Sequence, residues 1–241
     1  MRVADPAYRV EHDGDVVRLV GPSDLAYENA VVYARLADEA AADVAIRRQL
    51  AYFGALARDF EWKHFDHDPP AGLAEVLERH GFRREEPETL MVLDVASAVV
   101  ERCSVAFEVR EVGADGLADA MRVQREVAGQ DYPWLEPSLR RELAHAGDLS
   151  IHVGYVKEIP VAAGWMRCGT AFASIHGGAV LPAWRGRGAY RAVLASRVAR
   201  ARARGIRYIV SDSTAMSRPR LARMGFVELG RTTPFVFAGR R

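Results

Sequence analysis

The spacing of apolar and polar residues predicts strands and helices in both halves of the chain. In the first half it favours a strand near Val16–Val20 and a long Ala-rich helical stretch over about 27–58. In the second half it predicts a strand at 106–112, helices near 115–128 and 137–146, a hairpin of 150–156 and 159–168 around Lys157-Glu158, a strand at 171–181, a helix from Gly188 to about Arg204, and a strand at 206–210. Each half therefore combines strands with helices.

The first half echoes part of the second at a shift of 144 residues. The matched segments are WKHFDHDP (62–69) with IRYIVSDS (206–213), LERHGF (77–82) with LARMGF (221–226), and TLMVLD (89–94) with TPFVFA (233–238). Each copy reads as strand, acidic turn, short helix ending in Gly-Phe, and strand. The Gly suits a left-handed C-terminal cap, and the Phe can pack back onto the helix. We interpret the echo as an internal duplication; coincidence is the alternative, because such helix ends are common.

We expect two domains, 1–100 and 101–241, joined by a small, mildly apolar segment near 96–104. The chain has 241 residues, of which 49% are hydrophobic, so either one large core or two small ones can form. Apolar stretches are far shorter than the roughly 20 residues that span a bilayer, and the N-terminus has no apolar signal-peptide segment. We therefore expect a cytoplasmic protein that does not bind membranes. Cys103 and Cys168 are too far apart for metal-ligand spacing, so we expect free thiols and no metal site.

The charge of the chain is divided unevenly between the halves. Residues 1–100 hold 19 acidic against 11 basic residues, whereas residues 101–241 hold 13 against 22. Between Ile159 and Ser211 there is no Asp or Glu, and nine arginines occur there: 167, 185, 187, 191, 197, 200, 202, 204 and 207. A surface of this kind attracts polyanions, so an Arg-rich nucleic-acid-binding module is one hypothesis. Against it, the arginines of the 188–204 helix fall on several faces, and no ladder of aromatic residues accompanies them.

An Arg/Gly turn lies between the strand at 171–181 and the helix that follows. The segment IHGGAVLPAWRGRGAYRAVL (175–194) runs from an apolar strand through Pro182 into Arg185, Gly186, Arg187 and Gly188. The first amides of a helix have no intrahelical acceptor, and the helix dipole places partial positive charge there. Glycines allow a bulky phosphate to approach the main chain. The turn therefore predicts a site for a nucleotide-like pyrophosphate.

This segment resembles the signature Q/R-x-x-G-x-G/A of the GNAT acyltransferase superfamily. The resemblance to that family extends over about residues 105–238. Arg185, Gly186, Arg187, Gly188 and Ala189 fit the pattern, while Tyr190 stands where it has Gly or Ala. The resemblance implies the α+β GNAT fold, with a central mixed sheet flanked by helices, and acetyl-CoA as co-substrate on the loop 185–190. The first half looks like a reduced copy of the same fold without a cofactor site.

Two adjacent glycines, Gly177-Gly178, interrupt the strand before the turn. They predict a β-bulge that bends this strand away from the one at 206–210 and leaves backbone groups unpaired. The amide-rich arm of the co-substrate can satisfy such groups as an added strand would. The resemblance assigns this contact to the main chain of Gly178, Ala179 and Val180. Close packing of a helix on the sheet is a second, compatible reason for the glycines.

The acid–base residues follow the family pattern only in part. His176 stands where many family members have a glutamate base, and Ser174 shares its strand face; the alternative is a structural histidine. The usual general acid, a tyrosine four residues before the Gly of Gly-Phe, is replaced by Leu221, and the usual Asn seven residues earlier by Thr214. Ser213, Ser217 and Tyr190 are the hydroxyl groups nearby in sequence. We expect Ser217 either to contact the co-substrate or to cap the helix that starts at Arg218-Pro219.

The acceptor is expected at the loop GQDYPWLEP (129–137), which shapes the acceptor pocket in this fold. Asp131 and Glu136 suit a cationic amine, and Tyr132 and Trp134 suit its apolar walls; a turn anchored by aromatics is the alternative. The sequence therefore predicts an acetyltransferase that acts on a primary amine of a small molecule or peptide. Because Leu221 replaces the acid, a non-catalytic acyl-CoA-binding or regulatory protein is the alternative. A dinucleotide-dependent oxidoreductase is excluded, since GRGAYR lacks the third Gly of the dinucleotide motif.

Overall fold

The structure is a computed structural model and describes residues 5–98, 107–145 and 147–239. Its contacts divide the chain into two compact units. Unit 1 comprises Met1–Leu90, Asp212–Ala215 and Leu229–Arg241, and unit 2 comprises Met91–Ser211 and Met216–Glu228. The boundary expected at residue 100 lies outside the described residues, as does Cys103.

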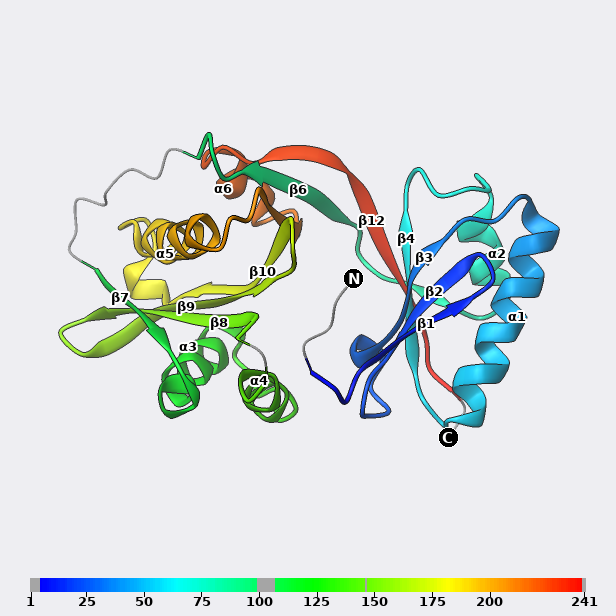
Figure 1. Cartoon of the computed structure of the whole chain (residues 1–241), viewed down its shortest axis with the longest axis horizontal. Coiled ribbons are helices and arrows are strands. Elements are labelled where there is room, and N and C mark those ends of the chain that lie inside the picture. Colours follow the sequence, from blue (N-terminus) through cyan, green and yellow to red (C-terminus); the bar gives the residue numbers. More distant parts are fainter. Residues whose placement is uncertain (1–4, 99–106, 146, 240–241) are drawn as a thin grey trace. The chain divides into compact units, whose positions relative to one another are not determined.

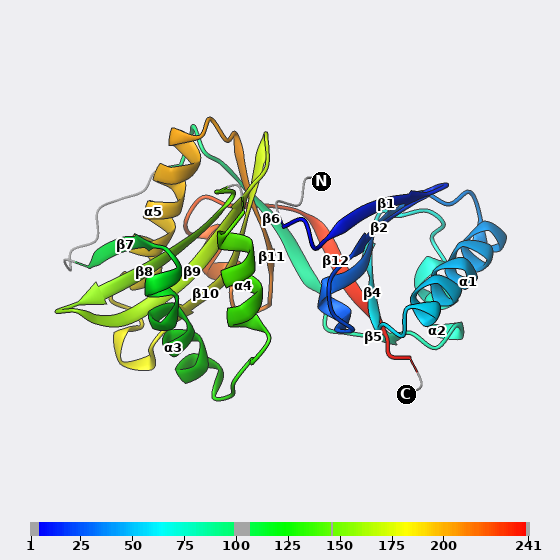
Figure 2. The same ribbon diagram turned by 60° about the horizontal axis from the view of Figure 1, so that its bottom comes forward.

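Unit 1 is a mixed sheet with helices on one side. Its strands and helices are β1 (Arg9–Asp13), β2 (Val16–Val20), the 3-10 helix η1 (Ala26–Glu28), β3 (Asn29–Ala34), α1 (Glu39–Ala55), β4 (Phe60–Phe65), α2 (Leu73–Arg79), β5 (Arg83–Arg84) and the later part of β12 (Val227–Phe237). The order is β1-β2-β3-β4-β12, with β5 beside β12, and β3 and β4 are parallel while their neighbours are antiparallel. Figures 1 and 2 show α1 and α2 on the same side of these strands.

An aromatic cluster forms the core of unit 1. The ring of Phe53 from α1 stacks on Phe60 of β4 with centroids 4.3 Å apart, and Trp62 and Phe235 are fully buried beside them. Burial of each such ring removes a large apolar surface from water and stabilises the fold by about 1.5–3 kcal/mol. Phe53 therefore packs α1 onto the sheet, and Leu73, Val76 and Leu77 bring α2 into the same cluster.

The helix expected over 27–58 is wrong in its first part. Residues 29–34 form β3, and α1 begins only after Asp38, whose carboxylate accepts a hydrogen bond from the amide of Ala41 at 2.8 Å. The β-branched residues in NAVVYA suit a strand, and β3 gains a parallel partner in β4. The alanines that suggested one long helix are therefore divided, since Ala30 and Ala34 belong to β3 and most of the later ones to α1.

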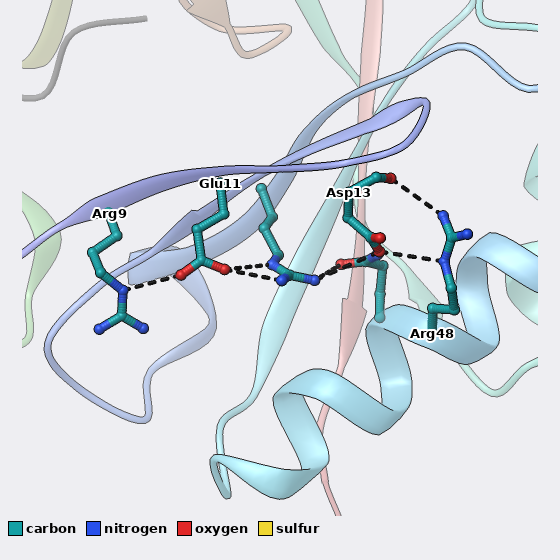
Figure 3. A network of polar contacts seen from close by, with 6 residues as sticks. Arg9, Glu11, Asp13 and Arg48 are labelled. Atoms are coloured by element: carbon teal, nitrogen blue, oxygen red, sulfur yellow. Dashed lines mark hydrogen bonds and ion pairs between the residues drawn. The ribbon is translucent and has the colours of Figure 1, made fainter.

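Ion pairs and hydrogen bonds tie α1 to the β1–β2 hairpin, as Figure 3 shows. Arg18 of β2 pairs with Glu11 at 2.9 Å and donates to the side-chain oxygen of Gln49 on α1. Asp13 accepts hydrogen bonds from Gln49, and it also pairs with Arg48 at 3.3 Å. Burial raises and the surrounding hydrogen bonds lower the pKa of Glu11, with a net shift downward. The network fixes which end of the hairpin faces α1.

The sequence echo is confirmed as a repeated helix end. Gly81 and Gly225, which are 144 residues apart, both adopt a left-handed conformation, with φ of +87° and +89°. In each copy the Phe after the Gly donates its amide to a Leu five residues earlier, at 3.1 Å in one and 3.2 Å in the other. This bond pattern is the Schellman motif. Duplication of the whole unit stays a prediction.

The closing strands of the two halves were expected to stay in their own domains. Instead, Thr232–Phe237 of β12 pairs antiparallel with β4 in unit 1. Residues 91–94 of β6 (Glu88–Asp94) belong to unit 2, where Met91 and Leu93 are buried. Strand patterns carry no information on their partners, so the sequence alone did not reveal this arrangement.

Unit 2 is a mixed sheet with helices on both faces. Its further elements are β7 (Glu108–Val112), η2 (Ala114–Gly116), α3 (Leu117–Ala128), α4 (Leu135–Leu143), β8 (Leu149–Val156), β9 (Ile159–Cys168), β10 (Phe172–Val180), η3 (Pro182–Trp184), α5 (Ala189–Ala203), β11 (Tyr208–Ser213) and α6 (Arg218–Ala222). The strand order is β6-β11-β10-β9-β8-β7; β10 and β11 are parallel, whereas β10, β9, β8 and β7 pair antiparallel in turn. These elements confirm the expected ones to within a few residues.

The faces of the unit 2 sheet carry different helices. Alternate residues of β8 point to opposite sides: Ile151 and Val153 pack with α3 and α4, while His152 faces α5. Figure 1 shows α5 on one side of β8, β9 and β10 and α3 and α4 on the other. None of the described helices is long and apolar enough to cross a membrane. The sheet thus presents the ends of β10 and α5 next to each other.

Candidate functional site

The two glycines of β10 form the predicted bulge. The register with β9 shifts between His176 and Ala179, and Gly177 has a φ of +59°. A Cβ at Gly177 would overlap the ring of Trp165, so only glycine fits. The carbonyl of Gly177 accepts a hydrogen bond from the side-chain amide of Gln124 on α3. The bulge is therefore fixed from the neighbouring strand and from a helix.

Beyond the bulge, β10 no longer pairs with β11. The parallel ladder covers only Phe172–Ser174 against Tyr208–Val210, although β10 continues to Val180. The amide of Leu181 donates to Val161 of β9 at 2.9 Å, so by strand alternation the amide of Val180 points toward the other edge. Among the described residues no strand pairs with β10 at that edge after Ser174. An extended ligand with amide groups can occupy it.

The Arg/Gly turn leads from β10 into α5. Gly186 and Gly188 both have positive φ, +74° and +92°, and Gly188 is the residue before the first turn of α5. In the described part of the chain, the amides of Gly186, Arg187 and Ala189 donate no hydrogen bond to a protein group. These donors, with the positive end of the helix dipole, form a cradle for an anion.

The two arginines of the turn are held by protein groups on one side. Arg185 donates from Nε to the carbonyl of Val180 at 3.2 Å, and the guanidinium of Arg187 lies 5.2 Å from the centroid of the Trp184 ring. Both arginines keep further N–H donors, which suit an anion.

His176 is exposed on the bulged strand. Its Nε2 lies 2.8 Å from the hydroxyl of Ser174, which stands on the same strand face, as the two-residue spacing predicted. The hydroxyl fixes the orientation of the ring. His176 is therefore positioned beside the bulge with access to solvent.

The other expected acid–base positions differ in their surroundings. Leu221 is buried in the core of unit 2, with 1% exposure, and offers no proton. Ser217 is the residue before α6, and its carbonyl accepts from the amides of Arg220 and Leu221 at 3.0 Å. Its side chain makes no capping hydrogen bond with the helix. Ser217 therefore starts α6 through its main chain only.

A pocket of about 350 Å³ lies between α3, the 129–134 loop and α4. It is lined by Met121, Gln124, Arg125, Asp131, Tyr132, Pro133, Leu135, Glu136, Pro137 and Arg140. Gln124 links this pocket to the bulge, because the same side chain donates to the carbonyl of Gly177. The pocket is therefore adjacent to the bulge, after which β10 no longer pairs with β11.

Some of the expected acceptor residues line this pocket and one does not. Asp131, Tyr132 and Glu136 are lining residues, whereas Trp134 packs against the ring of Tyr132 with centroids 6.0 Å apart. Both carboxylates have arginine partners: Arg125 with Asp131 at 3.4 Å and Arg140 with Glu136 at 2.8 Å. The sequence reasoning missed both arginines and Gln124, whose positions on α3 and α4 carry no distinguishing pattern. The pocket is charged but balanced.

A buried polar layer lies beneath the site, between α5 and the sheet. Arg197 of α5 is fully buried, and its Nε and Nη2 have no hydrogen-bond partner in the described part of the chain. His152 of β8 is also fully buried and hydrogen-bonds to Ser196 at 2.8 Å and to Ser150 at 3.0 Å. Burial, with the nearby charges of Arg197 and Arg200, lowers the pKa of His152 to about 3. This histidine is therefore neutral in the folded protein.

Acid is expected to destabilise unit 2 through His152. Its folded pKa of about 3 is below the ordinary value of 6.5. The contribution of His152 to the free energy of unfolding is therefore complete above pH 6.5 and is lost as the pH falls toward 3. The loss from this group is about 1.4 kcal/mol per pH unit. In His152→Gln this slope should disappear, as measured by hydrogen exchange of β8 and β9 amides. His67→Gln, which changes an exposed histidine, should retain the slope; equal slopes in wild type and His152→Gln contradict the assignment.

At least four of the nine arginines between 159 and 211 are engaged by other groups of the fold. Arg200 pairs with Glu111 at 3.4 Å, Arg204 with Asp148 at 2.8 Å, and Arg167 with Glu142 at 2.9 Å. Arg202 donates to the carbonyls of Val95 and Ala98 at 3.0 and 2.6 Å. The basic run thus spreads over several contacts and does not form one open stripe.

No protein-family model matches the sequence, and no curated protein matches it. Solved structures do match over nearly the whole chain. A GCN5-related N-acetyltransferase from Kribbella flavida has a TM-score of 0.75 at 18% identity and covers 97% of this chain and 91% of its own. A functionally unknown conserved protein from Staphylococcus epidermidis has a TM-score of 0.74 at 15% identity, with coverage of 97% and 95%.

A third match contains two copies of the fold. It is described as a tandem GNAT protein from the clavulanic acid biosynthesis pathway and has a TM-score of 0.66 at 12% identity, covering 100% of this chain and 86% of its own. Together with the mixed sheet, the bulged β10 and the Arg/Gly turn before α5, these matches establish the architecture. The chain has the fold of the GCN5-related N-acetyltransferases.

Proposed function

We propose that this protein is an N-acetyltransferase that transfers the acetyl group of acetyl-CoA directly to a primary amine of a small molecule or peptide. One observation carries the proposal. The unpaired amides before α5, the unpaired edge of β10 and the pocket at Gln124 follow one another along unit 2. This order matches the pyrophosphate, the amide-rich arm and the acceptor of such a reaction.

The Arg/Gly turn fits the diphosphate of acetyl-CoA. The amides of Gly186, Arg187 and Ala189 supply neutral donors, and Arg185 and Arg187 supply charge. The pantetheine arm would add to the edge of β10 at Gly178, Ala179 and Val180. A backbone N–H directed at the thioester carbonyl stabilises the developing oxyanion by about 3–4 kcal/mol.

The amine must be neutral when it attacks the thioester carbon. His176, oriented by Ser174, lies beside the bulge and can accept the proton that the amine loses, directly or through water. Much of the rate enhancement would come from holding the two substrates together. The pocket at α3 and α4 supplies this second position, with Tyr132 as an apolar wall and Asp131 and Glu136 as acceptors for a cationic amine before it deprotonates.

Two alternative functions compete with this proposal. Buried Leu221 favours a non-catalytic acyl-CoA-binding protein, because the usual acid is absent at that position. A nucleic-acid-binding module has less support, since Arg167, Arg200 and Arg204 are engaged by carboxylates of the fold. Binding of RNA that weakens steeply with salt and ignores acetyl-CoA would support the latter.

A screen for CoA release separates these functions. Wild-type protein is incubated with acetyl-CoA and a broad panel of amines, including peptides and polyamines, and free thiol is measured. Release that requires one amine class supports the enzyme. Saturable binding of acetyl-CoA without release for any amine leaves only the binding protein, and no binding contradicts both.

The variant His176→Ala is expected to keep acetyl-CoA affinity and to lower kcat by about 100-fold, because a general base typically contributes at least that much. His67→Ala changes an exposed histidine of unit 1 and should leave kcat unchanged. Steady-state rates with the best amine and a binding isotherm check both. Undiminished turnover in His176→Ala removes this residue from the mechanism.

A further inference from the structure

The structure also places a candidate proton donor at the bulge. Tyr190 occupies the second position of α5, where the signature has a small residue. A Cβ built at Gly178 would lie 2.5 Å from Cε2 of the Tyr190 ring and 3.2 Å from its hydroxyl oxygen. The phenol therefore lies directly against Gly178, one of the strand residues along which the pantetheine arm is proposed to bind.

Arg197 lies beside the phenol. Its guanidinium carbon is 5.8 Å from the centroid of the Tyr190 ring. A guanidinium has only donors, so toward Arg197 the phenol oxygen can act only as an acceptor. The hydroxyl hydrogen of Tyr190 can then be donated to another group.

The buried guanidinium is costly and has few partners. Burial lowers the pKa of Arg197, and its Nε and Nη2 have no hydrogen-bond partner in the described part of the chain. Tyr190 on the same helix and His152 on β8 are ionisable groups near it. A cation in this place would stabilise negative charge on the phenol oxygen, which is the charge that proton donation creates.

Tyr190 and the position of the missing acid share one hydrophobic cluster. Tyr190 packs against the hydrophobic cluster that contains Leu221, Leu194 and Phe226. The family resemblance places a tyrosine at 221, where a buried leucine now stands. Position 221 on α6 therefore has no hydroxyl, whereas Tyr190 on α5 provides one at the same cluster.

We propose that Tyr190 donates the proton to the sulfur that leaves, and that Arg197 positions its hydroxyl; this rests on the proposed function. The amine nitrogen forms a bond to the thioester carbon, and the C–S bond breaks with its electron pair going to sulfur. The O–H proton of Tyr190 moves to that sulfur and gives CoA as the free thiol. The amine proton passes to the base, and the phenolate recovers a proton from solvent.

The test compares Tyr190→Phe and Tyr190→Ala with wild type. Tyr190→Phe keeps the ring against Gly178 and removes only the donor, so kcat should fall by about 100-fold while KM for acetyl-CoA stays near the wild-type value. Tyr208→Phe, which removes the hydroxyl of a β11 tyrosine, should change neither value.

Arg197 is tested as a positioning residue by Arg197→Lys and Arg197→Met. The lysine retains a donor and should retain more kcat than the methionine, while KM for acetyl-CoA should stay near the wild-type value in both; thermal unfolding shows whether each variant folds. A wild-type rate in Tyr190→Phe overturns the proposal. So does a gain in acetyl-CoA affinity and rate in Tyr190→Ala, since the ring would then merely fill space. A wild-type protein without turnover contradicts the proposed function itself, and the role of Tyr190 with it.

Discussion

Gly188→Asp is expected to weaken acetyl-CoA binding by at least about 100-fold, or about 2.8 kcal/mol. Gly188 precedes the first turn of α5 and has a φ of +92°. An aspartate there places a carboxylate at the unpaired amides of the cradle, where it repels the diphosphate and competes for the same donors. Isothermal titration with acetyl-CoA measures the change.

Two controls separate charge from backbone strain. Gly188→Asn keeps the size of the side chain without the charge, and asparagine tolerates a left-handed conformation well. It should therefore lose much less affinity than the aspartate. Gly205→Asp places the same residue at the other end of α5, also at a positive φ of +67°, and should bind like wild type. Equal losses in the Asp and Asn variants of Gly188 would show that the charge is irrelevant.

Gly177→Ala is expected to destabilise unit 2 by about 2–4 kcal/mol, since it adds overpacking to an unfavourable backbone conformation. Its Cβ would overlap the Trp165 ring at a residue with φ of +59°. Chemical denaturation followed by Trp fluorescence, with hydrogen exchange of β9 and β10, measures the loss. The bond from Gln124 to the Gly177 carbonyl should weaken with it.

Gly129→Ala is the matched control for this variant. Gly129 has a similar φ of +67°, and a Cβ there meets nothing within 4 Å, so its cost should be only about 1 kcal/mol. Trp165→Leu removes the ring that the alanine meets. The double variant Gly177→Ala/Trp165→Leu should therefore be destabilised by less than the sum of the two single variants. Strict additivity would mean that the ring does not hold the bulge.

Local patterns predicted much of unit 2. The pair Lys157-Glu158 interrupts two apolar runs, and both residues adopt positive φ, as a tight hairpin turn requires. Gly177-Gly178 predicted the bulge, and Gly188 predicted the start of α5. These predictions succeeded because the backbone at each position adopts a positive φ or is closely packed, which restricts the residues that fit there.

Other features depend on tertiary contacts that no local pattern encodes. The strand β3 was hidden in an Ala-rich stretch, since its parallel pairing with β4 outweighs helix propensity. The C-terminal part of β12 pairs in unit 1 although its pattern equals that of any closing strand. Arg197 looked like one more basic residue in an Arg-rich helix, yet it is fully buried. The sequence therefore predicted the Arg/Gly turn but not the buried polar groups between α5 and the sheet.

Calorimetry of the wild-type protein with acetyl-CoA tests the central claim, which is that the amides before α5 bind the diphosphate of a thioester co-substrate. The account predicts saturable heat at micromolar concentrations, and much weaker binding of S-acetylpantetheine, which lacks the diphosphate. Absence of saturation up to about 1 mM acetyl-CoA, or equal affinity for the two thioesters, would contradict it.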